Sequence, residues 1–238
     1  MRFDIITIFP KILDSYFSES LLKKAQDNGL ISIQTHNLRD FTEDKHRKVD
    51  DSPYGGGPGM VLKAEPIAKA VEYVRNVGAV GNVQMKQTKR LNKRSGQTSR
   101  TRVILFSLRG KKFDQKEAHR LAKYDQLIFI CGRYEGVDER VAQYVADEEI
   151  SLGDFVLSGG ELPAAIVIEA VSRLIPGMLG KIESLEEKKG SYPVYTKPEA
   201  VKLSGAKSAS GGLKVLKVPK VLLSGDHKKI DEWRNRNS

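Results

Sequence analysis

Residues 127–163 read LIFICGRYEGVDERVAQYVADEEISLGDFVLSGGELP, and this stretch decides the fold. Residues 127–131 form a short apolar run rich in β-branched and aromatic side chains, which predicts a buried strand. Ordinary turns of an α/β domain would account for single glycines after such a strand. Glycine also lets a backbone approach a ligand closely or adopt a positive φ. The closely spaced glycines therefore predict a pocket walled by main chain, formed by Gly132, Gly136, Gly153, Gly159 and Gly160.

The rest of the chain alternates expected strands with expected helices. Apolar runs predict strands at residues 3–9, 30–35 and 103–106. Apolar residues at helical spacing predict helices at residues 12–25, 64–77, 118–122, 137–145 and 161–174. This alternation predicts an α/β fold with a mostly parallel sheet and ligands at the carboxyl ends of its strands, where the glycine turns lie. Because true knots are rare, the pattern alone favours an unknotted order.

The composition indicates a globular protein with a polyanionic partner. Of the 238 residues, 39% are hydrophobic, which suffices for a sizeable core. The net charge of +10 favours RNA or DNA, although excess charge also serves solubility. No apolar run approaches the roughly 20 residues that span a bilayer, and the first residues lack the apolar core of a signal peptide, so we expect a cytoplasmic protein without membrane association. The one cysteine, Cys131, lies where a small buried hydrophobe is expected.

A long polar segment follows the second expected strand and has no regular period until Pro66. Such segments inside a compact domain are usually functional or disordered. This one contains YGGGPGM at residues 54–60, which lacks the lysine and spacing of a phosphate-binding P-loop. The glycine run is either a flexible hinge or a backbone that approaches a flat base or a cofactor.

Composition changes mark three further regions. Residues 84–102 carry many Lys and Arg and no acid, which predicts a mobile basic insertion that is either simply solvated or contacts RNA phosphates. Residues 176–198 are polar and punctuated by Gly and Pro, as is typical of an interdomain linker. Residues 199–238 are basic, with a helix expected from Lys228, and predict a small C-terminal domain that needs RNA or a partner subunit for stability.

Four segments resemble one known family. GRYEGVDERV at residues 132–141, EEISLGDFVLSGGELPA at 148–164, HRKVDDSPYGGGPGM at 46–60 and VPKVLLSGDHKKIDEWR at 218–234 are similar to the bacterial tRNA (guanine-N1)-methyltransferases, the TrmD family of the SPOUT class. The resemblance implies S-adenosylmethionine-dependent methylation of N1 of guanosine 37 in tRNA, next to the anticodon. It also implies a homodimer with shared active sites. The expected fold is a catalytic domain over residues 1–175 with a deep trefoil knot at about 103–175, followed by a small, mainly helical tRNA-binding domain.

The resemblance also assigns the candidate site residues. Arg173 is expected to meet the negative charge that builds on guanine O6, because its guanidinium stays charged and presents parallel N–H groups. Its alternative role is to complement the carboxyl end of a helix. Residues around the glycine turns are expected to bind the cofactor: Leu105, Ser107, Gly132, Tyr134, Glu135, Ser151, Leu152, Gly153, Phe155, Val156, Leu157, Gly159, Gly160 and Pro163. A second set is expected to face the tRNA: His46, Asp50, Tyr54, Gly57, Pro58 and Ser184.

The general base is the point at which this chain departs from the family. The family uses an aspartate in the linker, where this sequence has Glu183, so Glu183 is the predicted base. Glu186 and Glu187 are alternatives for the base. All three glutamates could instead belong to an exposed run of charges on a helix, without a catalytic role. Leu108 stands where the family usually has proline.

Two rival functions follow from the same residues. One is a related knotted enzyme that methylates a ribose 2′-oxygen, and the other is an RNA-binding homologue with impaired catalysis, which the altered linker suggests. Cofactor loops that match the family argue against the second rival. The resemblance implies Mg2+ dependence, although the sequence contains no dedicated metal-ligand cluster.

Overall fold

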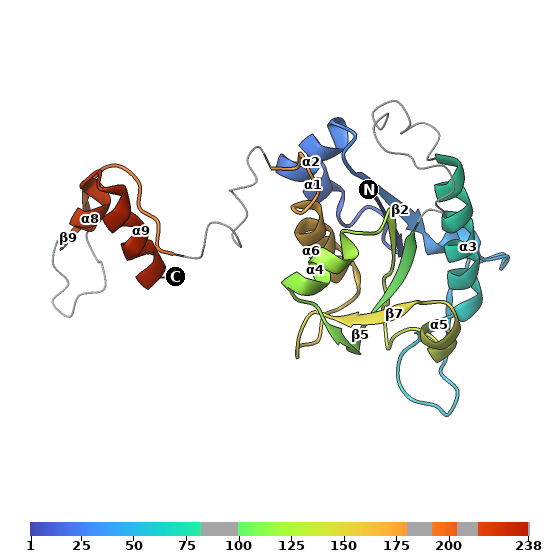
Figure 1. Cartoon of the computed structure of the whole chain (residues 1–238). Coiled ribbons are helices and arrows are strands. Elements are labelled where there is room, and N and C mark those ends of the chain that lie inside the picture. The colour runs from blue at the N-terminus through green and yellow to red at the C-terminus, as the bar shows by residue number, and fades with distance from the viewer. Residues whose placement is uncertain (82–99, 180–191, 204–213, 238) are drawn as a thin grey trace. The chain divides into compact units, whose positions relative to one another are not determined.

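The computed structural model describes residues 1–81, 100–179, 192–203 and 214–237 (Figure 1). The chain divides into two compact units, Met1–Met178 and Leu179–Ser238, and each is described by itself. Most of the predicted basic insertion lies outside the described residues, as do Glu183, Ser184, Glu186 and Glu187. None of the helices in the described ranges is long and apolar enough to cross a membrane.

A five-stranded sheet with only parallel pairings forms the centre of the first unit, in the order β2-β1-β6-β5-β7. The strands are β1 (Arg2–Thr7), β2 (Ser32–Asn37), β5 (Thr101–Lys112), β6 (Gln126–Ile130) and β7 (Glu148–Ser151). Each inner strand contains a short buried apolar run, as parallel strands covered on both faces require. The prediction of an α/β fold with a mostly parallel sheet is confirmed.

Helices cover both faces of this sheet. One core cluster packs one face of the sheet against α1 (Asp14–Phe17), α2 (Ser20–Asp27), α4 (Gln115–Leu121) and α6 (Glu161–Ser172). The other cluster packs the opposite face against η1 (Leu38–Phe41), α3 (Ala64–Gly81) and α5 (Glu139–Tyr144). Alternate side chains of each strand supply the two clusters: on β1, Phe3 and Ile5 face the first, and Ile6 faces the second.

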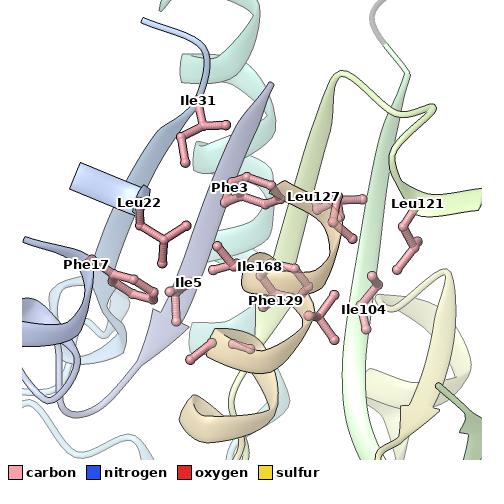
Figure 2. Close-up of a cluster of buried hydrophobic side chains, with 14 of the residues drawn as sticks. Phe3, Ile5, Phe17, Leu22, Ile31, Ile104, Leu121, Leu127, Phe129 and Ile168 are labelled. Carbon is pink, nitrogen blue, oxygen red and sulfur yellow. The ribbon is translucent and has the colours of Figure 1, made fainter. Parts of the chain in front are cut away.

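Aromatic side chains from three neighbouring strands stack in the first cluster. Phe129 of β6 is fully buried, with its ring centroid 6.4 Å from that of Phe3 on β1 and 5.7 Å from that of Phe106 on β5. Figure 2 shows Phe3 and Phe129 beside Ile168 of α6, with Leu121 of α4 on the same side of the sheet. These contacts join β1, β6 and β5 to the helices that cover them.

Two boundaries differ from the sequence prediction. The helix expected over residues 12–25 is broken into α1 and α2, because the chain turns between Ser18 and Ser20 and Ser20 adopts a φ of +54°. The strand expected at 103–106 is longer: β5 begins at Thr101, so Thr101 and Arg102 do not belong to a mobile insertion. Arg102 is fixed there by its ion pair with Glu148 of β7, at 2.7 Å.

Strand β5 also continues beyond its predicted end, after an excursion at residues 107–110. Phe106 and Lys111 both pair with Ile150 of β7, so the intervening residues loop out of the ladder. Gly110 closes the excursion against β7, where an added Cβ would lie 2.5 Å from the Ile150 nitrogen. Only glycine fits this approach, and it lets the loop return to the sheet.

The second unit contains a strand pair that the sequence analysis missed. Strands β8 (Ala200–Leu203) and β9 (Lys214–Lys217) are antiparallel, and α8 (Lys220–Leu223) and α9 (His227–Arg236) follow them. Tyr195, assigned to the linker from the sequence, has its ring 6.3 Å from that of Trp233 on α9. The two strands, AVKL and KVLK, are only four residues long and show no regular alternation of lysine and apolar residues, so they give no distinct strand signal.

The aromatic stack predicts a large cost for truncating its central ring. Phe129→Ala should lower the free energy of unfolding of the first unit by about 3–5 kcal/mol, because it removes buried area and leaves a cavity among Phe3 and Phe106. Urea denaturation followed by circular dichroism measures this. Tyr144→Ala, at an exposed ring on α5, is the control and should leave stability nearly unchanged. Equal stability of the two variants would contradict the assigned core.

Candidate functional site

A cavity of about 460 Å³ opens at the carboxyl ends of β5, β6 and β7. Its walls come from residues 105–109 within β5, residues 132–137 after β6, and residues 149–153 and 155–160 at the end of β7 and after it. Every residue that the sequence analysis assigned to the cofactor lines this cavity, from Leu105 to Pro163. Ligands of α/β proteins bind at this end of the sheet, so position and lining together mark it as the candidate site.

The turn after β6 forms the first wall and has an unusual backbone. Tyr134 adopts a φ of +61°, which is rare for a residue with a side chain, and its ring is half exposed. The turn closes with a hydrogen bond from Gly136 N–H to the Arg133 carbonyl, at 3.1 Å. Strain of this kind gathers at ligand sites, where the surrounding structure holds it in place.

The loop after β7 forms the second wall and lies directly against the first. Gly160 N–H donates to the Gly132 carbonyl at 3.0 Å, and a Cβ at Gly160 would lie 2.6 Å from Cys131 Cα. At the other end of the loop, Gly153 N–H donates to the Ser151 hydroxyl at 3.2 Å. The two walls are therefore joined through main-chain contacts at glycines that line the cavity.

A buried ion pair, which the sequence analysis missed, fixes the two walls together. Glu161, at the start of α6, is 2% exposed and accepts hydrogen bonds from Arg133 Nε at 3.0 Å and from the Thr7 hydroxyl at 2.6 Å. Arg133 also donates to the Ser158 carbonyl and stacks over the Phe9 ring, 4.9 Å from its centroid. The available signal was an acid in the first turn of a helix, where the helix dipole favours negative charge.

This ion pair also bears on Cys131. Burial raises the pKa of the Cys131 thiol well above its usual value, the nearby Glu161 carboxylate raises it further, and Arg133 opposes this in part. The thiol therefore stays protonated at neutral pH and is a poor nucleophile. Cys131 acts as a small buried side chain against Gly160, as expected from the sequence.

The third wall carries charged groups from β5, α5 and β7. Arg109, in the excursion of β5, donates to Glu139 at 2.7 Å and lies 3.6 Å from Oε2 of Glu149. This Oε2 atom is buried and has no hydrogen-bond partner among the described residues. Leu108, beside Arg109, is exposed at the cavity edge.

The residues expected to face tRNA lie near the cavity without lining it. His46, Tyr54, Gly57 and Pro58 are exposed, and Asp50 is in β3 (Asp50–Asp51), which pairs with β4 (Val61–Leu62). This segment is attached to the first wall: Glu135 N–H donates to the Met60 carbonyl at 3.1 Å, and Leu62 N–H donates to the Gly136 carbonyl at 3.0 Å. The segment from Asp50 to Leu62 is therefore joined to the first wall of the cavity within the first unit, while Ser184 lies outside the described residues.

Arg173 is distant from the cavity of its own chain. Gly160 caps the beginning of α6 and Arg173 caps its end. A helical rise of about 1.5 Å for each residue separates the two by about 20 Å. The described residues contain no group of three or more His, Cys, Asp or Glu placed to hold a metal ion.

Comparisons with known proteins agree over the whole chain. The family model described as tRNA (Guanine-1)-methyltransferase TrmD matches residues 1–238. A tRNA (guanine-N(1)-)-methyltransferase of Carboxydothermus hydrogenoformans is 44% identical and that of Dictyoglomus turgidum 46%, each over 100% of this chain and 83% and 85% of the relative. The crystal structure of tRNA (m1G37) methyltransferase from Aquifex aeolicus matches with a TM-score of 0.70 and 40% identity, over 98% of this chain and 87% of that chain.

The buried ion pair predicts an asymmetric response to mutation. Arg133→Leu should lower the free energy of unfolding by about 3–5 kcal/mol, because it leaves the Glu161 carboxylate buried without its cation. The double variant Arg133→Leu/Glu161→Leu should lose less, since no uncompensated charge remains. Thermal unfolding measures both. Arg140→Ala, which breaks an exposed pair with Asp138, is the control and should leave stability unchanged. A double variant less stable than Arg133→Leu would contradict this account.

Proposed function

The chain belongs to the tRNA (guanine-1)-methyltransferase TrmD family, and we propose that it methylates N1 of guanosine 37 in tRNA through the cavity described above. The observation that carries this proposal is the convergence of residues from three separated segments on one cavity at the carboxyl end of the sheet. Leu105, Tyr134 and Leu157 are far apart in the sequence, and their spacing does not require them to line the same cavity. That they do so supports a common ligand.

The residues that line the cavity suit S-adenosylmethionine by their glycine main chain and by their polar groups. Two of its lining residues keep main chain accessible to a ligand, because a Cβ would lie 2.6 Å from Cys131 Cα at Gly160 and 3.1 Å from Val137 Cγ2 at Gly132. The orphaned oxygen of Glu149 offers an acceptor to a ligand. We propose that the assigned main-chain groups hold the adenosine part and that Tyr134 and Glu135 position the amino-acid part. When bound, S-adenosylmethionine supplies an electrophilic methyl group.

The remaining chemistry belongs to the guanine. A base must accept the N1 proton, and a donor must meet the negative charge that builds on O6. We propose Arg173 as the donor, since a guanidinium presents two parallel N–H groups to one acceptor region. Glu183 is the proposed base, with Glu186 and Glu187 as alternatives. All three carboxylates follow Arg173 within 14 residues of the sequence.

The distance along α6 supports an active site shared by two subunits. Arg173 and the cavity of the same chain stand at opposite ends of the helix, so one chain cannot apply both to one guanine in this conformation. Apolar side chains on the outer face of α6 and of the segment before α1 are exposed, namely Leu162 (59%), Ile166 (48%) and Ile12 (51%). Exposed apolar side chains of this kind are typical of a subunit interface. We propose a homodimer in which each cavity receives Arg173 from the partner subunit.

The family class implies a trefoil knot, and the chain path supports it. From β7, at the edge of the sheet, residues 152–160 return past β5 to the carboxyl end of β6, where Gly160 bonds Gly132. We propose that this return passes through the loop formed by the preceding segments, so that the cavity is the knot itself. The knot would then restrict the backbone of the glycine turns at residues 132–136 and 152–160 to one conformation.

Other properties of the proposal follow from a tRNA substrate. The basic second unit, the insertion at 84–102 and the exposed set from His46 to Pro58, with Ser184, would contact the tRNA phosphates and the anticodon loop. A cytoplasmic location follows from that substrate. Dependence on Mg2+ stays a prediction from the family, and the described residues assign it no ligands.

Methyl transfer from labelled S-adenosylmethionine to tRNA transcripts tests the function. A transcript with guanosine at position 37 should yield 1-methylguanosine after nuclease digestion, and a matched transcript with adenosine there should yield no label. Label recovered in a 2′-O-methyl nucleotide would favour the ribose methyltransferase instead. Binding of both tRNA and cofactor without transfer would indicate the catalytically impaired homologue.

The exposed face of α6 predicts dimerisation through apolar contacts. Ile166→Glu should convert the protein to a monomer, because it places a charge in a surface that the partner would bury. Sedimentation equilibrium measures the mass, and Tyr144→Glu, at an exposed ring elsewhere, is the control. A wild-type protein that sediments as a monomer, or an Ile166→Glu variant that stays dimeric, would contradict this interface.

A further inference from the structure

The carboxylate of Glu149 lies in the wall of the cavity and has an oxygen without a hydrogen bond. Its Oε2 atom is buried and lacks a hydrogen bond within the described part of the chain. The Glu149 side chain as a whole is 25% exposed to solvent. Glu149 pairs in register with Leu105, which also lines the cavity. The neighbouring Glu148 points to the other face of β7, where Arg102 and Arg120 bind it at 2.7 and 2.6 Å. Two adjacent carboxylates thus have opposite environments.

The cations near the cavity do not satisfy Glu149. Arg109 directs its hydrogen bond to Glu139 at 2.7 Å and stays 3.6 Å from Oε2 of Glu149, beyond hydrogen-bond distance. Arg133 is bound by Glu161 on another wall. A buried acceptor without a donor costs free energy in the empty protein, and this cost is relieved when a ligand supplies a donor or a positive charge.

We infer that Glu149 discriminates the cationic cofactor from its neutral product. The inference rests on the proposed function, because it takes S-adenosylmethionine as the ligand of the cavity. S-adenosylmethionine and S-adenosylhomocysteine share the adenosine and the amino-acid parts, and differ by the methyl group and the positive charge on sulfur. Arg109 is the ion-pair partner of both Glu139 and Glu149, so its single charge does not balance the two carboxylates. Within a partly buried cavity, the remaining negative charge acts on the sulfonium much more strongly than it would in water. Loss of the charge on methyl transfer then removes this attraction, which favours release of the product.

Calorimetric titration of the full-length protein with each ligand tests this inference without using activity. In Glu149→Gln, affinity for S-adenosylmethionine should fall by about tenfold, the size expected for one charge-assisted contact, while affinity for S-adenosylhomocysteine stays unchanged. Glu148→Gln removes a charge from the same strand outside the cavity and should leave both affinities unchanged. Thermal unfolding of each variant checks that it is folded.

A second variant keeps the test decisive if Glu149→Gln does not fold. Arg109→Gln removes the cation nearest to Glu149, so the preference for S-adenosylmethionine over its product should increase. Equal weakening of both ligands in Glu149→Gln would assign the residue to a shared part of the ligand and overturn the discrimination, as would unchanged binding of both. A decreased preference in Arg109→Gln would also overturn it. A wild-type protein that binds neither ligand would overturn the proposed function as well, which separates the two failures.

Discussion

The contact between the loop after β7 and the end of β6 is the constraint on which the site depends. Gly160 lies so close to Cys131 that a Cβ there would be 2.6 Å from a backbone atom, and its N–H bonds the Gly132 carbonyl. This contact brings two glycine turns together as walls of one cavity. It also fixes the position of Gly160, the residue that caps the start of α6. Because α6 is a rigid element, this fixes the position of Arg173 at its other end as well. A single close approach of two backbones thus positions both the cavity proposed to bind the cofactor and the residue proposed to act on the guanine.

The buried ion pair beside this contact serves position more than stability. Glu161 is almost completely buried and the Arg133 side chain is 17% exposed, and the cost of desolvating the two charges offsets much of their attraction. An apolar pair would hold the helix equally well. Unlike an apolar pair, Arg133 also donates to the Ser158 carbonyl and stacks on Phe9, so it joins the first wall, the second wall and the segment after β1. Directional bonds of this kind keep a loop of many glycines in one conformation.

The sequence predicted the cavity better than it predicted the shape of the chain around it. Apolar runs and glycine turns identified β6 and both main walls, and family resemblance supplied the lining from Leu105 to Pro163. The break between α1 and α2 was missed because apolar spacing continues across Ser20, where only φ changes. The return of β5 to β7 after Gly110 and the Arg133–Glu161 pair depend on contacts between residues far apart in sequence, which no local pattern records. The separation of Gly160 from Arg173, in contrast, follows from the length of α6, a helix that the sequence did predict.

The central claim is that one active site combines the cavity of one subunit with Arg173 of the other, and subunit mixing tests it most directly. Arg173→Ala removes the donor, and Leu157→Trp fills the cavity, so each homodimer should be inactive in methyl transfer to tRNA. A heterodimer of the two variants, purified through two different tags, retains one cavity and one Arg173 on opposite chains. The account predicts that this heterodimer regains a large part of the wild-type activity. An inactive heterodimer, beside an active one formed from wild type and Leu157→Trp, would show that cavity and Arg173 must belong to the same chain.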